Sequence, residues 1–462
     1  MSIIIPANSA AGGAGYQVDN SLRLNSASSD YLSRSSTAGN KKTWTFSFWL
    51  KRSKLDVLQF IAFSDVANYF RMRITSGNVF EIFDSNTNKT WNWYPLLRDT
   101  SAFYHLVLRA DSTDGTNGNR LRLYINGTLA LANTVGSISQ NYDFSFNQGG
   151  TFQIAKGNST DYLDGYLAET ILIDGQALAP TDFGEFDEDS GIWKPIDVSG
   201  LTFGSQGFYL DYKDSGALGN DVSGNNKDFT ANNLTAIDQT TDTCTNNFCT
   251  FNILDNINAS TFAEGNLKIT TVSGNYSPNT STFRVIEGKW YWEIKLVQDT
   301  NTGANEVDMI GFSNNSVQAT STNPSSIGIN YRGNGKIWNY GGTAEATGYA
   351  TFSTGDIIMV AADLTGATTG KLYFGVNGTW GNSGNPATGA NSYNFTKGTE
   401  PWGPSVTCYS SGSSAIFEAN FGNAPYAISS GNADGNGYGN FEYAVPSGYL
   451  ALNSKNLSGV LS

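Results

Sequence analysis

The sequence contains few of the residues that build metal centres, disulfide frameworks and catalytic dyads. It has one histidine, His105, and three cysteines, Cys244, Cys249 and Cys408, in 462 residues. A low and odd cysteine count excludes a disulfide scaffold, although Cys244 and Cys249 could either close a small loop or remain free thiols. With a single histidine and so few cysteines, the sequence predicts no zinc site.

Charged residues and long apolar runs are also scarce. Charged residues make up 15% of the chain, the formal net charge is −13, and the largest basic cluster is Lys51, Arg52 and Lys54. Phosphate-binding surfaces need many clustered Lys and Arg side chains, so neither nucleic acid nor an anionic membrane is expected as a partner. The longest later apolar run, residues 357–362, is too short to cross a bilayer and predicts a strand.

The start of the chain, MSIIIPANSA, has no basic residue, and Pro6 interrupts its apolar run. It therefore does not resemble a signal peptide, and we expect a soluble protein made in a cytoplasm, without membrane insertion. Residues 1–15 are small and glycine-rich. They are typical of an arm that is either free or docked on a partner, and we interpret them as an attachment arm.

Aromatic residues and glycine are abundant instead. Aromatic residues make up 13% of the chain, and glycine accounts for 51 positions. Tyr, Phe and Trp favour strands, whereas Gly, Asn, Ser and Thr favour turns. The composition therefore predicts an all-β protein with long polar loops, and its aromatic content argues against disorder.

Two similar hairpins are predicted far apart in the chain. Residues 370–380, GKLYFGVNGTW, alternate as a strand does and then reach Asn377-Gly378, a pair suited to a type I′ turn. Residues 121–130, LRLYINGTLA, show the same pattern of an alternating strand followed by an Asn-Gly pair, here Asn126-Gly127. Two copies roughly 250 residues apart predict two related β-sandwich modules.

The first module resembles the laminin-G-like, concanavalin-type jelly roll. Its predicted strands begin with WTFSFWLKR at 44–52, in which Trp44, Phe46, Phe48 and Leu50 share one face. The closing motif of that family is matched by residues 162–186, except that Ala168 replaces the family's Asp while Glu169 remains. The resemblance implies a laminin-G-like sandwich over residues 16–195.

The second module resembles a SPRY domain. Motifs of that family appear in order at 288–296, 307–313, 355–364, 370–380 and 417–422. The resemblance implies a SPRY-like sandwich over residues 259–452. The predicted fold is therefore two jelly-roll or concanavalin-like β-sandwiches. They are joined by a long extended connector at 196–258 that lies against one or both of them, and a C-terminal tail covers 453–462.

No catalytic constellation stands out. A retaining glycosidase needs two carboxylates about 5 Å apart, and Glu293 in WYWEIKL has no acidic partner at strand spacing. His105 lies on a predicted strand between apolar neighbours, and no nucleophile elbow accompanies it. We therefore predict structural roles for Glu293 and His105, and a protein that is not an enzyme.

One polar loop has oxygen ligands at alternating positions, as a Ca²⁺ loop does. Asp221, Ser223, Asn225 and Asp228 supply them, but the glycine and closing glutamate of an EF-hand are missing. A plain Asx-rich turn is the favoured interpretation. No cofactor is expected, with one structural Ca²⁺ left open.

Two surfaces are candidates for ligand recognition. In residues 86–95, the side chains of Asn86, Asn88, Trp91, Trp93 and Tyr94 have the composition of a sugar-binding site, although a pair of tryptophans at strand spacing also suits a core. In the SPRY-like module, Tyr331, Arg332, Asn334 and Tyr340 lie on or near predicted loops, where relatives of that family bind peptides and other ligands.

The combination of modules, polar loops and arm resembles the virion surface proteins of tailed phages, particularly marine ones. It implies a tail-fibre or receptor-binding component on the virion surface, with a capsid decoration or head-fibre protein as the alternative. Expected partners are other virion proteins, a host-surface glycan or protein, and further copies of the chain, with a trimer expected. A carbohydrate-active enzyme and an intracellular adaptor are the other classes considered.

Overall fold

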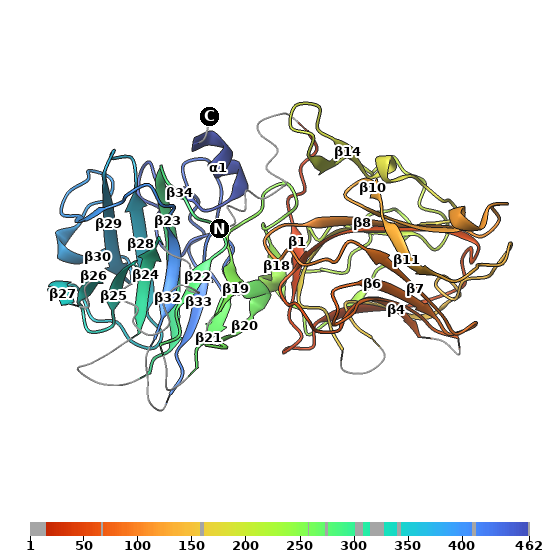
Figure 1. The fold of residues 1–462 in the computed structure, drawn as a ribbon, viewed down its shortest axis with the longest axis horizontal. Helices are drawn as coiled ribbons and strands as arrows, with labels where there is room; N and C mark the ends of the chain where they lie inside the picture. Colours follow the sequence, from red (N-terminus) through yellow and green to blue (C-terminus); the bar gives the residue numbers. More distant parts are fainter. Residues whose placement is uncertain are drawn as a thin grey trace. The chain divides into compact units, whose positions relative to one another are not determined.

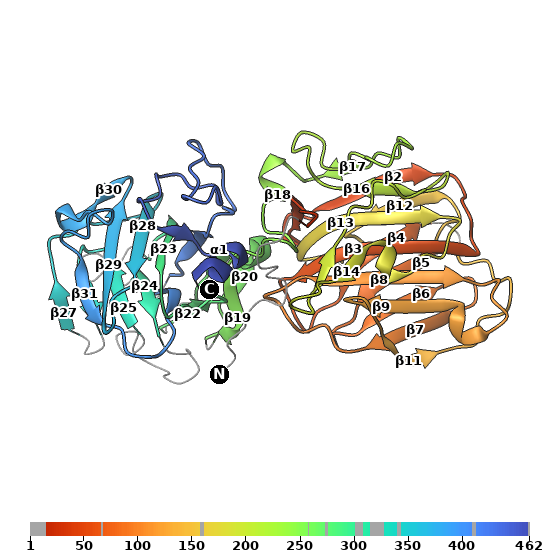
Figure 2. The same ribbon diagram turned by 90° about the horizontal axis from the view of Figure 1, so that it is seen from above.

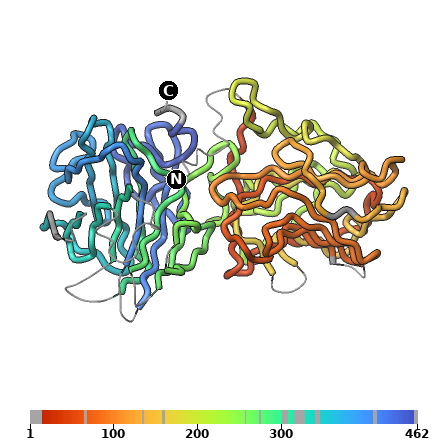
Figure 3. Tube along the Cα trace, in the orientation of Figure 1, coloured from red at the N-terminus to blue at the C-terminus, as the bar shows by residue number. Residues whose placement is uncertain are grey.

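The computed structural model describes residues 15–65, 68–157, 161–256, 258–272, 276–300, 308–314, 328–339, 343–408 and 413–460. The chain forms two compact units, one ending at Asn247 and the other beginning at Phe248. Within the described ranges both consist almost entirely of β-strands and loops, as Figure 1 shows, and the all-β prediction is confirmed. Figure 3 traces the same chain along its Cα atoms. The predicted attachment arm lies outside the described residues, apart from Gly15.

The first unit is a sandwich whose described residues form two eight-stranded antiparallel sheets. In spatial order, sheet A contains β10 (Thr128–Leu129), β9 (Leu121–Ile125), β8 (Tyr104–Asp111), β3 (Thr43–Arg52), β13 (Gly165–Asp174), β1 (Ser21–Leu24) and β18 (Gln239–Thr240), with β16 (Phe208–Leu210) also paired to β13. Sheet B contains β11 (Leu131–Val135), β7 (Lys89–Tyr94), β6 (Phe80–Asp84), β5 (Phe70–Ile74), β4 (Gln59–Asp65), β12 (Gly150–Ile154), β2 (Tyr31–Ser36) and β17 (Thr230–Asn232). In Figure 1, β8 lies in one layer and β4, β6 and β7 lie in the other.

The core lies between these sheets, and sheet A is covered on its outer face as well. Trp44, Phe46, Phe48 and Leu50 of β3 all point into the core, as the alternation predicts. The intervening Trp49 is also buried, because a smaller cluster containing Trp193 of the hairpin β14 (Gly184–Phe186) and β15 (Trp193–Pro195) covers that face.

Both predicted hairpins have the backbone of a type I′ turn. Asn126 and Gly127 have φ values of +49° and +76°, and Asn377 and Gly378 have φ values of +48° and +85°. Positive φ at both central positions is what this turn requires, and Asn-Gly adopts it at low cost.

Much of the segment 196–258, predicted as a connector lying against the sandwiches, is built into the sheets of the first unit. Its strands β16, β17 and β18 pair with β13, β2 and β1, so they extend both sheets of the first unit. Without these strands, the sandwich would have open sheet edges and a partly uncovered face. Backbone groups and apolar surface would then be exposed to water. Residues up to Asn247 therefore belong to the first unit, and Phe248 begins the second.

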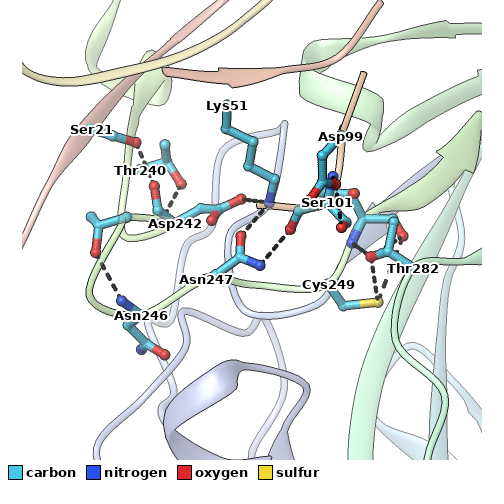
Figure 4. Close-up of polar contacts among 12 residues, drawn as sticks. Ser21, Lys51, Asp99, Ser101, Thr240, Asp242, Asn246, Asn247, Cys249 and Thr282 are labelled. Atoms are coloured by element: carbon cyan, nitrogen blue, oxygen red, sulfur yellow. Dashed lines mark hydrogen bonds and ion pairs between the residues drawn. The ribbon is translucent and has the colours of Figure 1, made fainter. Parts of the chain in front are cut away.

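A buried ion pair holds the last part of this segment in the first unit (Figure 4). The Lys51 ammonium lies 2.8 Å from Asp242 Oδ2 and 2.7 Å from Asn247 Oδ1. Asn247 donates in turn to the carbonyl of Ser101, and Ser21 Oγ donates to the carbonyl of Asp242 at 2.6 Å. A charge buried this deeply needs both a counter-ion and hydrogen bonds, and this network supplies both.

The second unit is also a sandwich, formed in its described residues by a seven-stranded and a nine-stranded sheet. The smaller sheet contains β19 (Phe251–Asn256), β22 (Asn279–Ser281), β32 (Gly403–Thr407), β24 (Met309–Ser313), β25 (Gly328–Arg332), β26 (Ile337–Asn339) and β27 (Thr343–Ala346). The larger sheet contains β20 (Thr261–Ala263), β21 (Lys268–Thr270), β33 (Ile416–Asn420), β23 (Lys289–Gln298), β28 (Ile357–Asp363), β29 (Thr369–Val376), β30 (Thr379–Trp380), β31 (Tyr393–Thr396) and β34 (Leu450–Ala451).

Within the predicted C-terminal tail, residues 454–460 are helical. They form the short helix α1 (Ser454–Val460), whose first residues are buried in the second unit. Short 3₁₀ turns complete the described structure: η1 (Asn117–Asn119), η2 (Pro180–Asp182), η3 (Ala236–Asp238), η4 (Glu264–Asn266) and η8 (Gly381–Ser383). None of the helices in the described ranges is long and apolar enough to cross a membrane.

Candidate functional site

The tryptophans of the predicted sugar-binding segment belong to the core. Trp91 and Trp93 are both buried between the sheets of the first unit, and Trp91 packs on Phe144 while Trp93 packs on Phe80. Strand β7 is paired on both sides, so its alternate side chains must enter the sandwich. Neither ring is available to stack on a sugar, and their prediction as ligand-binding residues is wrong.

The remaining residues of that segment are exposed but are not brought together. Asn86 and Asn88 lie in the turn before β7, where Asn88 has a φ of +53°. Tyr94 is 40% exposed at the far end of the same strand. A strand of this length separates its ends by roughly 20 Å, so these side chains do not form one site.

In the second unit, the predicted contact residues are mostly buried. Tyr331 on β25 packs in the core against Phe352 and donates its hydroxyl to the carbonyl of Ala350. Arg332 is also buried, with its guanidinium 3.7 Å from the centre of the Trp338 ring. These two predictions are wrong, because β25 is covered on both faces. Asn334 is half-buried in the following turn, and Tyr340 lies outside the described residues.

The proposed calcium loop is a network of hydrogen-bonded turns. The two carboxylate oxygens of Asp221 accept four hydrogen bonds, from the amides of Tyr209, Ser223 and Lys227 and from the hydroxyl of Ser223. The Asn225 side chain donates to the carbonyls of Gly204 and Gly207 instead of facing Asp221. A cation here would have to displace those donors. Within the part of the chain that the structure describes, no three His, Cys, Asp or Glu side chains gather as metal ligands.

His105 is a buried structural residue whose hydrogen bonds have the wrong polarity for a general base. The indole nitrogen of Trp193 donates to Nδ1 at 2.9 Å, so the ring proton lies on Nε2 and is donated to Ser47 Oγ at 2.8 Å. A serine nucleophile would require the opposite direction. Burial lowers the pKa of His105 to about 3, so the ring stays neutral.

Glu293 is buried and fully engaged by donors. It accepts hydrogen bonds from the Tyr291 hydroxyl, the Asn420 side chain and the amides of Glu442 and Tyr443. Burial raises the pKa of its carboxyl above the ordinary value. These contacts attach residues 442–443 to the sheet, which is the structural role that the sequence predicts.

Glu169 is a buried acid whose role the sequence does not reveal. It lies at a bulge in the pairing of β13 with β3 and has a φ of +48°, which is strained for a non-glycine residue. Its Oε2 accepts the hydroxyls of Tyr209 at 2.6 Å and Tyr16 at 3.2 Å. Its Oε1 has no partner among the described residues, and burial raises the pKa to about 7.

The three cysteines are buried free thiols. Burial raises the pKa of Cys408 to about 11 and raises that of Cys244 as well. Cys244 and Cys249 therefore do not close a small disulfide loop. The buried thiols of the three cysteines provide neither exposed nucleophiles nor metal ligands.

A depression on the first unit is the best candidate for a ligand site. It encloses about 400 Å³ and is lined by residues 215–220, 228–229, 231 and 234–236. The half-buried Leu234 supplies apolar surface, whereas Leu218 and Phe229 also line the depression but are only 3% and 6% exposed. The polar groups come from Ser215, Asn220, Asp228 and Thr235. The volume of several hundred Å³ is in the range of small-ligand sites, but the exposed lining is more polar than the mostly apolar lining usual for such sites, which suits a polar ligand.

Asp228 gives this depression its charge. Its Oδ1 accepts a hydrogen bond from the amide of Asp221 at 2.9 Å, and the residue is exposed. From the sequence, Asp228 is expected in an Asx-rich turn, with calcium left open, and the segment is expected to be a connector, so the depression is not predicted. The only local signal for this region is FYLDY at residues 208–212, followed by a turn-rich segment, which predicts a strand and a loop.

The first unit matches a known family model. Residues 26–181 match the model described as "Concanavalin A-like lectin/glucanases superfamily". The predicted concanavalin-type domain is therefore confirmed for this part of the chain. The depression lies outside the matched residues. No curated protein matches the chain in sequence.

Several solved structures resemble parts of the chain. The SPRY domain of human HERC1 has 20% identity and a TM-score of 0.29, covering 37% of this chain and 96% of its own. Domains LG4-5 of the mouse laminin alpha1 chain have 10% identity and a TM-score of 0.28, covering 89% and 88%. A putative carbohydrate binding protein from Bacteroides ovatus has 14% identity and a TM-score of 0.33, covering 47% and 59%. Likeness at this level says nothing about the ligand of this protein.

Proposed function

We propose that this protein is a non-catalytic glycan-binding component of a tailed-phage virion, and that the depression at residues 215–236 binds an uncharged saccharide of the host surface. The observation that supports this most is the lining of that depression, which is mainly polar and has a smaller apolar part. Sugars present apolar C–H faces and rings of hydroxyl groups, and this lining complements both.

The charge of the site favours an uncharged ligand. Asp228 accepts hydrogen bonds and donates none when ionised, so it suits sugar hydroxyls and repels carboxylate or phosphate groups. The whole chain is acidic, with a net charge of −13, which adds to this repulsion.

The absence of a catalytic role is also part of the proposal. Glu293, Glu169 and His105 are buried and fixed by hydrogen bonds, so none of them faces the depression. Binding at a single open site of this kind is weak, and display of many copies on one particle would raise the overall affinity. A tail fibre is the favoured location, and a capsid decoration or head fibre is the alternative.

Asp228→Asn tests the site. The amide keeps the oxygen that accepts the Asp221 amide, so the loop should stay folded. Replacing the charged acceptor by a neutral one should weaken binding to neutral oligosaccharides on a printed glycan array by about 5- to 10-fold. Asp143→Asn, an exposed change on another loop, is the matched control and should bind as the wild type does.

Two results would contradict the glycan proposal. One is binding to no neutral glycan on the array, and the other is equal binding by Asp228→Asn and the wild type. Binding to host-surface protein after enzymatic removal of glycans would favour a protein receptor instead. Mass spectrometry of purified particles tests the virion location, which is wrong if the chain is absent from them.

A further inference from the structure

Three large apolar side chains are exposed at one corner of the first unit. Leu129 is 52% exposed and Leu131 is 74% exposed, while Ala130 between them is buried in the core. Because the buried residue points inward, its two neighbours must point outward. Tyr94, which is 40% exposed, lies directly opposite Leu131 in the pairing of β11 with β7. Leu129, Leu131 and Tyr94 are called the corner patch below.

The patch lies at the open edge of a sheet. β11 pairs with β7 on one side and is the last strand of its sheet among the described residues. Figure 2 shows it at the margin of the first unit. An edge strand presents backbone N–H and C=O groups that can pair with another strand, and natural proteins usually protect such edges with charges or proline.

This edge has neither charges nor proline, although β11 has a bulge between Ala132 and Thr134. Residues 123–142 contain no charged residue and no proline, although the chain as a whole carries a net charge of −13. Two copies of this acidic protein would repel each other at most other surfaces. At this edge two copies can meet without bringing like charges together. The β11 strand of each copy offers backbone N–H donors and C=O acceptors to the β11 strand of the other.

We infer that the corner patch and β11 bind the same edge of a second copy of this chain, with the two β11 strands antiparallel. Such a contact is isologous, so it closes at two copies and gives a dimer in place of the expected trimer. Burial of Leu129, Leu131 and Tyr94 against their counterparts stabilises the pair, and backbone pairing of β11 fixes its register. The contact does not depend on what the depression binds.

Sedimentation velocity of the full chain over a concentration series tests the contact. The wild type should sediment as a dimer at high concentration. Leu131→Asp should raise the dimer dissociation constant by at least about tenfold, because it places a carboxylate in an apolar interface. Val57→Asp is the matched control, since Val57 is 41% exposed elsewhere on the same unit, and it should leave the dimer intact.

Hydrogen exchange separates edge pairing from other contacts. In the wild type, the amides of residues 131–135 should become more protected as concentration rises, and in Leu131→Asp they should not. A wild type that stays monomeric, a dimer that Leu131→Asp leaves unchanged, or a dimer without new protection at 131–135 would overturn the inference. Glycan binding by single copies is measured separately, so either proposal can fail alone.

Discussion

Glu169→Gln should remove a loss of folding stability that the first unit undergoes as the pH rises. Glu169 has a pKa of about 7 in the folded protein against an ordinary 4.5, because burial disfavours the carboxylate. The folded pKa is the higher one, so the folded state binds the proton more tightly than the unfolded state does. The stabilisation from this proton is complete below about pH 4.5 and is lost as the pH rises to about 7.

The size of the effect follows from the shift. Moving the pKa from 4.5 to about 7 corresponds to about 3 kcal/mol of unfolding free energy, at about 1.4 kcal/mol per pH unit. Little of this is screened by solvent, since Glu169 is buried. Glutamine has the shape of the protonated acid, and its oxygen can still accept from Tyr209 and Tyr16. The variant should therefore gain about 3 kcal/mol relative to the wild type between pH 4.5 and pH 8.

Pulse proteolysis in urea, with mass spectrometry of peptides from the first unit, measures this difference at each pH. His105 changes the stability in the opposite direction, because its folded pKa of about 3 lies below the ordinary 6.5. Its contribution is present in both proteins and cancels in the difference. The control is Glu188→Gln, at an exposed position, and its difference in unfolding free energy from the wild type should stay the same at each pH. A difference between Glu169→Gln and the wild type that does not change with pH would refute the reasoning.

Two further predictions concern the stability of the first unit. Asp242→Asn should lower its unfolding free energy by about 3–5 kcal/mol in the same assay, because it leaves the buried Lys51 ammonium without its counter-ion; a loss below about 1 kcal/mol would show that the pair is not buried in solution. Trp91→Ala should cost about 3–5 kcal/mol because it empties a buried site, whereas the exposed Asn86→Ala should change stability by less than about 0.5 kcal/mol. Equal effects of the last two changes would contradict the placement of Trp91 in the core.

The sequence by itself determined the local structure where neighbouring residues decide it. Alternation placed Trp44, Phe46, Phe48 and Leu50 on one buried face, and the Asn-Gly pairs at 126–127 and 377–378 adopt the positive φ angles of tight turns. Period-2 patterns and turn chemistry act over a few residues, so they can be recognised without knowing what packs against them. The structural roles of His105 and Glu293 were predicted for the same reason, from apolar neighbours and missing acidic partners.

The tertiary structure decided which side of a strand is covered and where distant segments meet. Trp91, Trp93 and Tyr331 have the composition of contact residues, yet they are buried because sheets on both sides enclose them. The segment taken for a connector supplies β16, β17 and β18. Their pairing partners are distant in the sequence, such as Thr170 for Leu210 and Ser33 for Thr230, so a local pattern does not reveal them. The depression at 215–236 and the bulge at Glu169 likewise depend on that long-range pairing, and so the candidate site became visible only in the folded chain.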